Sequence, residues 1–339
     1  MKHSSLPVAG ALLLALLLPV RAPTALQPPV PVAGPHALDY QLLTNPGLEV
    51  YDPPYDQFEG VNCQVADGWQ RFSYDGPDPC LMDTRVFADS HLGTGWVERI
   101  EGSTSQLIVS AEPYTAGLWQ RVTGLTPGVG YGFHAAMLTI YQSSAPPAVE
   151  GTMIKQVGID PSGGTDPRAQ TVIWSEPGGR DEAWDLNQRV SVHAQGSEAT
   201  LFIRVASPLE AGPWPYLNLS FLDSSILART TPAAATSPGE SESASFVVRW
   251  SHGDPAPGVT RVKWYDIQWL DEAEGTWHDW LAEVKVRDGK VQETFVGERG
   301  HSYRFRARVW QKYENGAHLY SPYRPGGDTR TTVLGPELV

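Results

Sequence analysis

Residues 302–309 read Ser-Tyr-Arg-Phe-Arg-Ala-Arg-Val, and apolar and polar side chains alternate without a break from Tyr303 to Val309. A period of two residues is the pattern of a β-strand with one buried face. The stretch therefore predicts a strand whose apolar side chains face a core and whose arginines face outward. These arginines are either a basic stripe for an acidic partner or a solvated strand face with cross-strand partners such as Asp266.

The same period recurs along most of the chain. Residues 189–193, 200–205, 245–250 and 264–269 are short alternating runs rich in valine, isoleucine, phenylalanine and tryptophan. Glycine and proline clusters, such as Thr126-Pro127-Gly128, separate the runs. No stretch keeps a helical period of 3.6 residues for three turns. Many short strands joined by turns predict an all-β protein built from sandwiches or jelly rolls.

Length and charge restrict the function classes. A chain of 339 residues is long enough for two domains. Its formal net charge of −13 argues against nucleic acid and anionic lipid surfaces as partners, because both need a basic face. Most of the acidic excess lies before Thr230, and residues 230–243 form a small, polar, proline-containing stretch. We therefore place the domain boundary there, as a linker or as the first strand of the second domain.

The amino terminus predicts export. A basic start and an apolar run from Leu6 to Val20 are followed by small residues, which is typical of a signal peptide over residues 1–25. The run is too short to span a bilayer, although an uncleaved anchor is the alternative. Residues 26–38 are proline-rich and predict an extended spacer. The mature protein is therefore expected to be secreted or held in the cell envelope, with no membrane span.

The chain has two cysteines, Cys63 and Cys80. In an oxidising compartment they predict one disulfide, with two separate thiols as the alternative. Two sulfurs alone are too few ligands for a structural zinc site.

Residues 244–335 resemble a fibronectin type III domain, an immunoglobulin-like β-sandwich. The resemblance rests on Trp250, on the Tyr265-x-Ile267 pair and on the run from Gly300 to Arg308. It implies a spacer or docking module without catalytic residues. It also implies that Tyr303 forms a tyrosine corner, whose hydroxyl bonds to the backbone a few residues upstream.

Residues 39–229 resemble galactose-binding-like jelly rolls, which include the carbohydrate-binding modules of secreted glycoside hydrolases. The order of Asp67-Gly-Trp69, residues 116–122, residues 157–167 and residues 217–223 carries this resemblance. It implies a structural calcium ion between Glu49 and Asp223, because many such modules hold calcium between the first and last strands. A solvated carboxylate pair is the alternative.

The resemblance also implies a sugar-binding face. Strand parity places Leu118, Gln120 and Val122 inward, so that Trp119 and Arg121 share the opposite face. The side chains opposite the apolar positions of their strands are the predicted ligand-binding set: Trp119, Arg121, His134, His193 and Arg204. An amphipathic outer face with one covered tryptophan is the alternative. Tryptophans in or beside turns are secondary candidates for a rim: Trp96, Trp174, Trp184 and Trp214.

Hydrolase signatures are missing from the sequence. No G-x-S-x-G, H-E-x-x-H or phosphate-loop pattern occurs, and no carboxylate pair follows a glycosidase motif. The sequence therefore predicts a secreted, non-catalytic protein that binds a polysaccharide, another glycan or a surface protein. The alternatives are a structural or adhesive envelope protein without a sugar site, and a cryptic glycan hydrolase.

Overall fold

The computed structural model describes residues 40–58, 60–85, 99–141, 153–178, 181–208 and 217–335. The predicted signal peptide over residues 1–25 and the predicted spacer over residues 26–38 lie outside these residues, as do Trp96 and Trp214. Within the described residues, no helix is long and apolar enough to cross a membrane.

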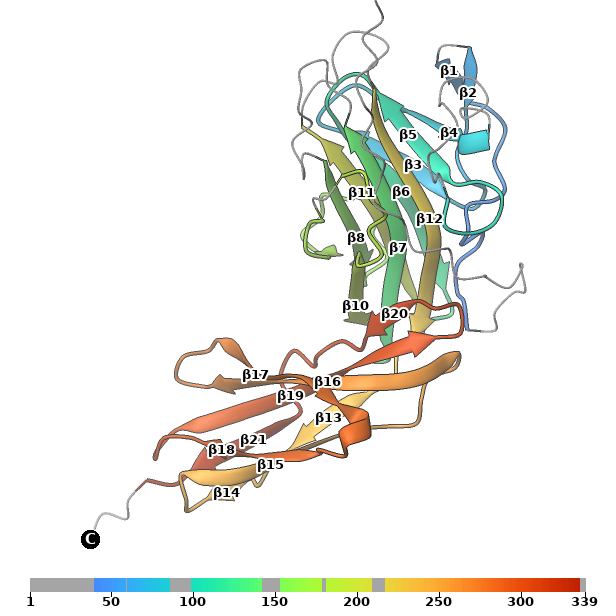
Figure 1. Cartoon of the computed structure of the whole chain (residues 1–339). Helices are drawn as coiled ribbons and strands as arrows, with labels where there is room; N and C mark the ends of the chain where they lie inside the picture. The colour runs from blue at the N-terminus through green and yellow to red at the C-terminus, as the bar shows by residue number, and fades with distance from the viewer. Residues whose placement is uncertain are drawn as a thin grey trace, which may run out of the picture. The chain divides into compact units, whose positions relative to one another are not determined.

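Residues 40–229 form two five-stranded antiparallel sheets (Figure 1). Sheet A has the order β10 (Arg189–His193), β7 (Gly130–Tyr141), β12 (Asn218–Arg229), β5 (Gln106–Ser110) and β4 (Cys80–Asp83). Sheet B has the order β3 (Gln70–Tyr74), β6 (Tyr114–Thr123), β11 (Glu198–Ser207), β8 (Ile154–Asp160) and β9 (Ile173–Trp174). A small hairpin joins β1 (Asp56–Phe58) to β2 (Val61–Cys63).

One core lies between sheets A and B. Leu118 and Leu201 of sheet B share it with Phe133 and Leu222 of sheet A, and all four are buried. Gln120 points into the same interior, where its amide donates to the carbonyls of Thr44 and Gly68. The predicted inward parity of strand β6 is therefore confirmed, and its polar member is fully bonded, as a buried amide must be.

Sheet A is buried on its second face as well. A separate cluster there contains Leu107, Leu138 and Phe221 from three strands of the sheet, together with Val61 and Cys63 of the hairpin. Sheet B has no such covering cluster among the described residues. The outer face of sheet B therefore carries no second apolar cluster among the described residues, although Phe202 at its centre is fully buried and exposure increases towards Trp119 and Arg121.

Cys63 and Cys80 form a disulfide, as predicted. It ties β2 to β4, and both sulfurs lie in the cluster that covers sheet A. The bond closes a short loop, with a sequence separation of 17 residues.

Replacing both cysteines with alanine is expected to lower the free energy of unfolding by about 3 kcal/mol, because the unfolded chain regains the entropy of the open loop. Urea unfolding of the two proteins would measure the loss. A reductant should destabilise the wild type by a similar amount and leave the double variant unchanged. Equal stability of the oxidised wild type and the variant would contradict this expectation.

Residues 233–333 form a second sandwich. One sheet contains β13 (Ala233–Thr236), β15 (Ser245–His252) and β18 (Gln292–Val296). The other runs β14 (Glu240–Ser241), β21 (Thr329–Val333), β19 (Ser302–Tyr313), β16 (Val259–Asp271) and β17 (Trp277–Lys285), with β20 (His318–Tyr320) on β19. A 3-10 helix, η1, covers Val286–Asp288. Residues 230–243 thus contribute β13 and β14.

The strand expected at residues 302–309 lies within β19. Its apolar side chains are buried in one core with Val248, Trp250 and Ile267. The hydroxyl of Tyr303 accepts a hydrogen bond from the backbone N–H of Glu298 at 2.7 Å, as expected for a tyrosine corner. The assignment of this sandwich to the fibronectin type III family stays a prediction.

The outward arginines of β19 have the expected cross-strand partners. Arg308 pairs with Asp266 at 3.0 Å, and Arg304 pairs with Glu272 at 2.6 Å. Arg306 donates to Gln268 at 2.8 Å. These arginines therefore hold the sheet together and are not free to form a basic stripe.

Candidate functional site: the aromatic face of sheet B

The outer face of sheet B carries a row of aromatic side chains. The strand register places Gln70, Trp119, Phe202, Gly158 and Trp174 side by side across five strands. Because directly opposed residues of neighbouring strands point to the same side, these side chains form one line across the sheet. We call this line, together with the neighbouring side chains Phe72, Tyr74, Arg121, Gln156 and Arg204, the aromatic face.

Trp174 lies flat against the sheet because its neighbour on β8 is a glycine. A Cβ atom at Gly158 would come within 2.7 Å of the Trp174 ring. On the other side of the indole, the guanidinium carbon of Arg204 lies 4.0 Å from the ring centroid, which is the geometry of a cation–π contact. Trp174 is therefore held between backbone and cation, with Phe202 5.9 Å away, centroid to centroid.

Arg204 is the centre of the adjacent row. It donates to the hydroxyl of Tyr74 at 3.1 Å and to the side-chain oxygen of Gln156. The ring of Phe72 lies over Gly117, beside Arg204. The partners of the guanidinium, Tyr74, Gln156 and Trp174, are all uncharged, so no acidic side chain pairs with Arg204 among the described residues.

Trp119 is the open position of the face. It is half-buried, and within the described part of the chain its indole makes no hydrogen bond and no ring contact. Arg121, two residues along the same strand, is exposed and donates to the carbonyl of Gly163 at 2.9 Å. A half-exposed indole plane next to a fixed guanidinium offers both an apolar surface and hydrogen-bond donors.

The structure brings together three of the five predicted ligand-binding residues: Trp119, Arg121 and Arg204. His134 and His193 lie on β7 and β10 of sheet A. His134 is buried, and its Nδ1 atom is 2.9 Å from the carbonyl oxygen of Gln188. His193 is half-buried, with Nδ1 3.2 Å from the carbonyl oxygen of Gly128. Neither histidine contributes to the aromatic face.

Five further side chains of the face were not among the predicted set: Gln70, Phe72, Tyr74, Gln156 and Phe202. Phe202 and Arg204 share strand parity, so the argument that selected Arg204 could also have selected Phe202. Strand β3, which supplies Phe72 and Tyr74, offered a weaker signal. Its alternate positions, Arg71 and Ser73, are polar, so no apolar face marks which side of the strand points inward. Trp174, expected only as a rim residue, lies within the face.

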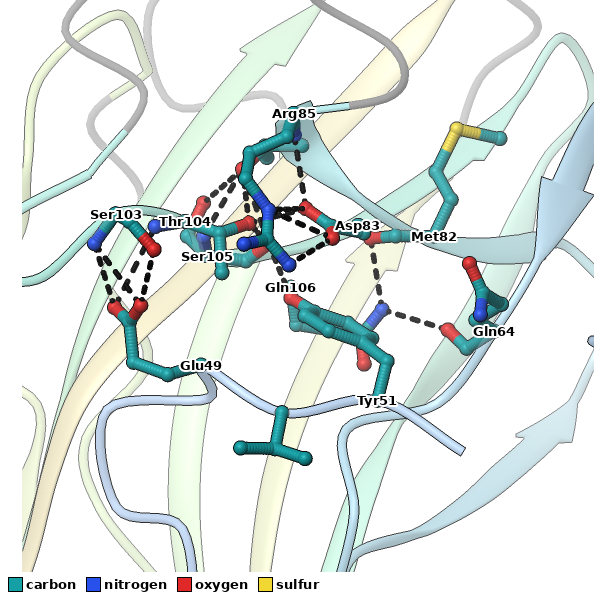
Figure 2. A network of polar contacts seen from close by, with 12 residues as sticks. Glu49, Tyr51, Gln64, Met82, Asp83, Arg85, Ser103, Thr104, Ser105 and Gln106 are labelled. Atoms are coloured by element: carbon teal, nitrogen blue, oxygen red, sulfur yellow. Dashed lines mark hydrogen bonds and ion pairs between the residues drawn. The ribbon is translucent and has the colours of Figure 1, made fainter. Parts of the chain in front are cut away.

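The predicted calcium ligands, Glu49 and Asp223, are engaged by hydrogen-bond donors. Figure 2 shows the Glu49 carboxylate, which accepts bonds from the backbone N–H and the hydroxyl of Ser103. Asp223 accepts backbone N–H bonds from Ile100 and Glu101, at 2.6 and 3.1 Å. A calcium ion would need these carboxylate oxygens as ligands, together with further oxygen atoms.

Among the described residues, no group of three or more His, Cys, Asp or Glu side chains is arranged to hold a metal ion. Burial raises the pKa of Asp223 to about 8 despite its backbone hydrogen bonds, and nearby Glu101 adds to the rise. Calcium at Glu49 and Asp223 stays a prediction from the resemblance alone.

No protein-family model matches the chain, and no curated protein matches it. Among solved structures, the module TmCBM61 in complex with beta-1,4-galactotriose is 13% identical, covers 56% of this chain and 98% of its own, and has a TM-score of 0.33. A beta-1,2-glucanase from Parabacteroides distasonis is 12% identical over 88% of this chain and 39% of its own, with a TM-score of 0.28. The adhesin domain of Epf from Streptococcus pyogenes is 10% identical over 81% and 95%, with a TM-score of 0.25. These similarities are too distant to bear on what this chain binds.

Proposed function

We propose that this chain is a secreted, non-catalytic glycan-binding protein, and that its ligand lies on the aromatic face of sheet B. The proposal rests on two observations. The indole of Trp119 has no hydrogen-bond or ring partner among the described residues, and Arg204 and Trp174 on the same face form a cation–π pair. Pyranose rings present C–H groups that pack on aromatic planes, and their hydroxyls accept and donate hydrogen bonds. The face supplies partners for both, which is the usual mixture of apolar surface and few fixed polar groups in a binding site.

The fibronectin-like sandwich is proposed to act as a spacer or docking module for this face. Binding without catalysis is proposed because the sequence has no carboxylate pair in a glycosidase motif. The cations of the face, Arg121 and Arg204, are fixed by protein contacts and can orient a sugar. A structural or adhesive role without a sugar site is the competing proposal. A glycan array with the full chain separates the two, because only the binding proposal expects retention of any polysaccharide.

Replacing Trp119 with alanine is expected to weaken glycan binding about tenfold or more, because truncation of a central aromatic anchor removes most of the stacking surface. Affinity electrophoresis in gels containing the best array ligand would measure the change. The melting temperature should stay close to that of the wild type, because Trp119 has no ring or hydrogen-bond partner among the described residues.

Val296→Ala serves as the matched control. Val296 is 70% exposed on β18 of the other sandwich, so that the substitution removes apolar surface without touching the aromatic face. It should leave binding unchanged. Wild-type affinity in Trp119→Ala, or loss of affinity in both variants, would overturn the placement of the site.

A further inference from the structure

The sheet that contains β16, β17 and β19 has a column of aromatic and cationic side chains on its outer face. Arg306 lies 3.9 Å from the ring centroid of Trp277 and 4.7 Å from that of Tyr323. Arg308 lies 4.8 Å from Tyr323 and 4.1 Å from Tyr320. Cations and rings therefore alternate along the face, and each guanidinium is shared between two aromatic side chains.

The column continues to a pair of stacked tryptophans. Trp310 is directly opposite Tyr320 on the neighbouring strand. The rings of Trp310 and Trp264 are stacked at 4.0 Å, with an angle of 11° between their planes. Trp310 is buried, whereas Trp264 is half-buried at the end of the column.

Four cations surround Trp264. Lys285 is directly opposite it on β17, and Lys263 precedes it and lies 4.2 Å from the Trp310 ring. Arg261 and Lys312 are directly opposite each other on β16 and β19. We call Trp264 and these four residues the basic end: Trp264, Arg261, Lys263, Lys285 and Lys312.

The cations of the basic end differ from Arg304 and Arg308, because they have no acidic partner within ion-pair distance among the described residues. Throughout the described ranges, no carboxylate oxygen lies within 4.0 Å of any of the four. Arg304 and Arg308, on the same sheet, pair with Glu272 and Asp266. Desolvation lowers the pKa of Lys263, and the nearby charges of Arg261 and Lys312 lower it further.

This arrangement is unfavourable for the protein alone. Like charges directly opposite each other on paired strands destabilise a sheet, and here they occur in a chain with a net charge of −13. Glu283 and Glu314 lie two residues from Lys285 and Lys312 along the chain, but among the described residues neither forms an ion pair with the basic end, so no direct pairing relieves the repulsion. A bound anion would relieve it.

We propose that the basic end binds a polyuronate, as a second glycan site separate from the aromatic face. The half-buried Trp264 offers a plane for a pyranose ring. Arg261 and the exposed lysines Lys285 and Lys312 offer charges for the carboxylates, and a guanidinium can bind a carboxylate through two parallel hydrogen bonds. Nucleic acid shares the stacking and the negative charge, but the acidic remainder of the chain would repel a long phosphate backbone.

The test measures retention of the full chain by polygalacturonate in affinity gels. It uses the Trp119→Ala background, so that the aromatic face does not contribute. Lys285→Gln/Lys312→Gln is expected to weaken retention about tenfold, the combined effect of two exposed charge pairs. Both lysines are exposed, so the fold should be retained, as circular dichroism would check. Added NaCl should weaken retention of the parent protein more than that of the variant.

Arg249→Gln/Arg299→Gln is the matched control, because it removes two exposed cations of the same sandwich that lie outside the strands of the basic end and, among the described residues, form no ion pair. It should bind like the parent. Poly-L-glutamate, which has carboxylates but no sugar ring, should be retained less than polygalacturonate. The proposal is overturned by unchanged retention of the Lys285/Lys312 variant, by equal retention on poly-L-glutamate, or by preferential binding of anionic phospholipid vesicles or single-stranded DNA. If the aromatic face proved not to bind glycan, the expected retention of the parent protein on polygalacturonate would be unchanged.

Discussion

Acidification from pH 7 to pH 4 is expected to cost the folded protein about 3 kcal/mol through His134 alone. Burial lowers the pKa of His134 to about 4 from its ordinary value of 6.5. One pKa unit corresponds to about 1.4 kcal/mol. The folded state therefore holds His134 neutral where the unfolded chain binds a proton, so the stability present above pH 6.5 is lost as the pH falls towards 4.

The groups around His134 explain the direction of the shift. Its Nδ1 atom faces the carbonyl of Gln188, which favours the proton, whereas desolvation and Arg189 oppose the charge more strongly. Asp185 favours the charged form weakly. His318 also has its pKa lowered to about 4, by burial and by the nearby charges of Lys263 and Arg189, and adds to the loss in acid. Asp223, with its raised pKa, acts in the opposite direction.

A variant isolates the contribution of His134. His134→Asn places an uncharged donor near the Gln188 carbonyl, so its stability should fall less between pH 7 and pH 4 than that of the wild type. Urea unfolding at several pH values measures the difference. His252→Asn, at a half-buried histidine of the other sandwich that forms no ion pair among the described residues, should reproduce the wild-type profile. Parallel pH profiles of the wild type and His134→Asn would show that His134 is not the titrating group.

Gly117→Ala is expected to destabilise the protein by about 3 kcal/mol, the upper part of the range for overpacked interiors. A Cβ atom at Gly117 would lie 1.8 Å from the carbonyl oxygen of Ile203, which is backbone of the paired strand β11. A backbone atom cannot rotate away, so β6 and β11 must separate. Phe72, whose ring lies over Gly117, would also be displaced from the aromatic face.

Gly196→Ala is the matched control for this substitution. No heavy atom lies within 4 Å of the position that its Cβ would take, and its backbone is not in the left-handed region. Thermal unfolding should place Gly196→Ala close to the wild type and Gly117→Ala well below it. Similar melting temperatures for the two variants would contradict the close packing of β6 against β11.

The fold class could be predicted because the strands keep their period. The alternation from Tyr303 to Val309 and the inward set around Leu118 both lie as expected. Parity alone placed His134 on an outer face, but β7 belongs to a sheet that is buried on both faces. His134 lies opposite the core positions of its strand and is nevertheless enclosed. Alternation distinguishes the two faces of a strand but does not show whether the second face is covered.

The composition of the aromatic face depended on strand order. Trp119, Phe202 and Trp174 become neighbours only because β11 lies between β6 and β8, an order that local sequence does not encode. Gly158 and Gly117 acquire their roles in the same way, as the places where Trp174 and Phe72 lie flat. Their sequence signal is a glycine inside a strand, which indicates a close approach but does not identify the approaching group.

The hairpin that the disulfide secures has a consequence for association. Strand β4 is the last strand of sheet A, and an unpaired edge strand invites pairing with another molecule. Here the carbonyl of Leu81 accepts the N–H of Gln64, and the N–H of Leu81 donates to the hydroxyl of Tyr55. The segment linked through Cys63 thus occupies the hydrogen-bonding groups that a foreign strand would need. The covalent link therefore helps to protect this sheet edge against pairing with a second molecule.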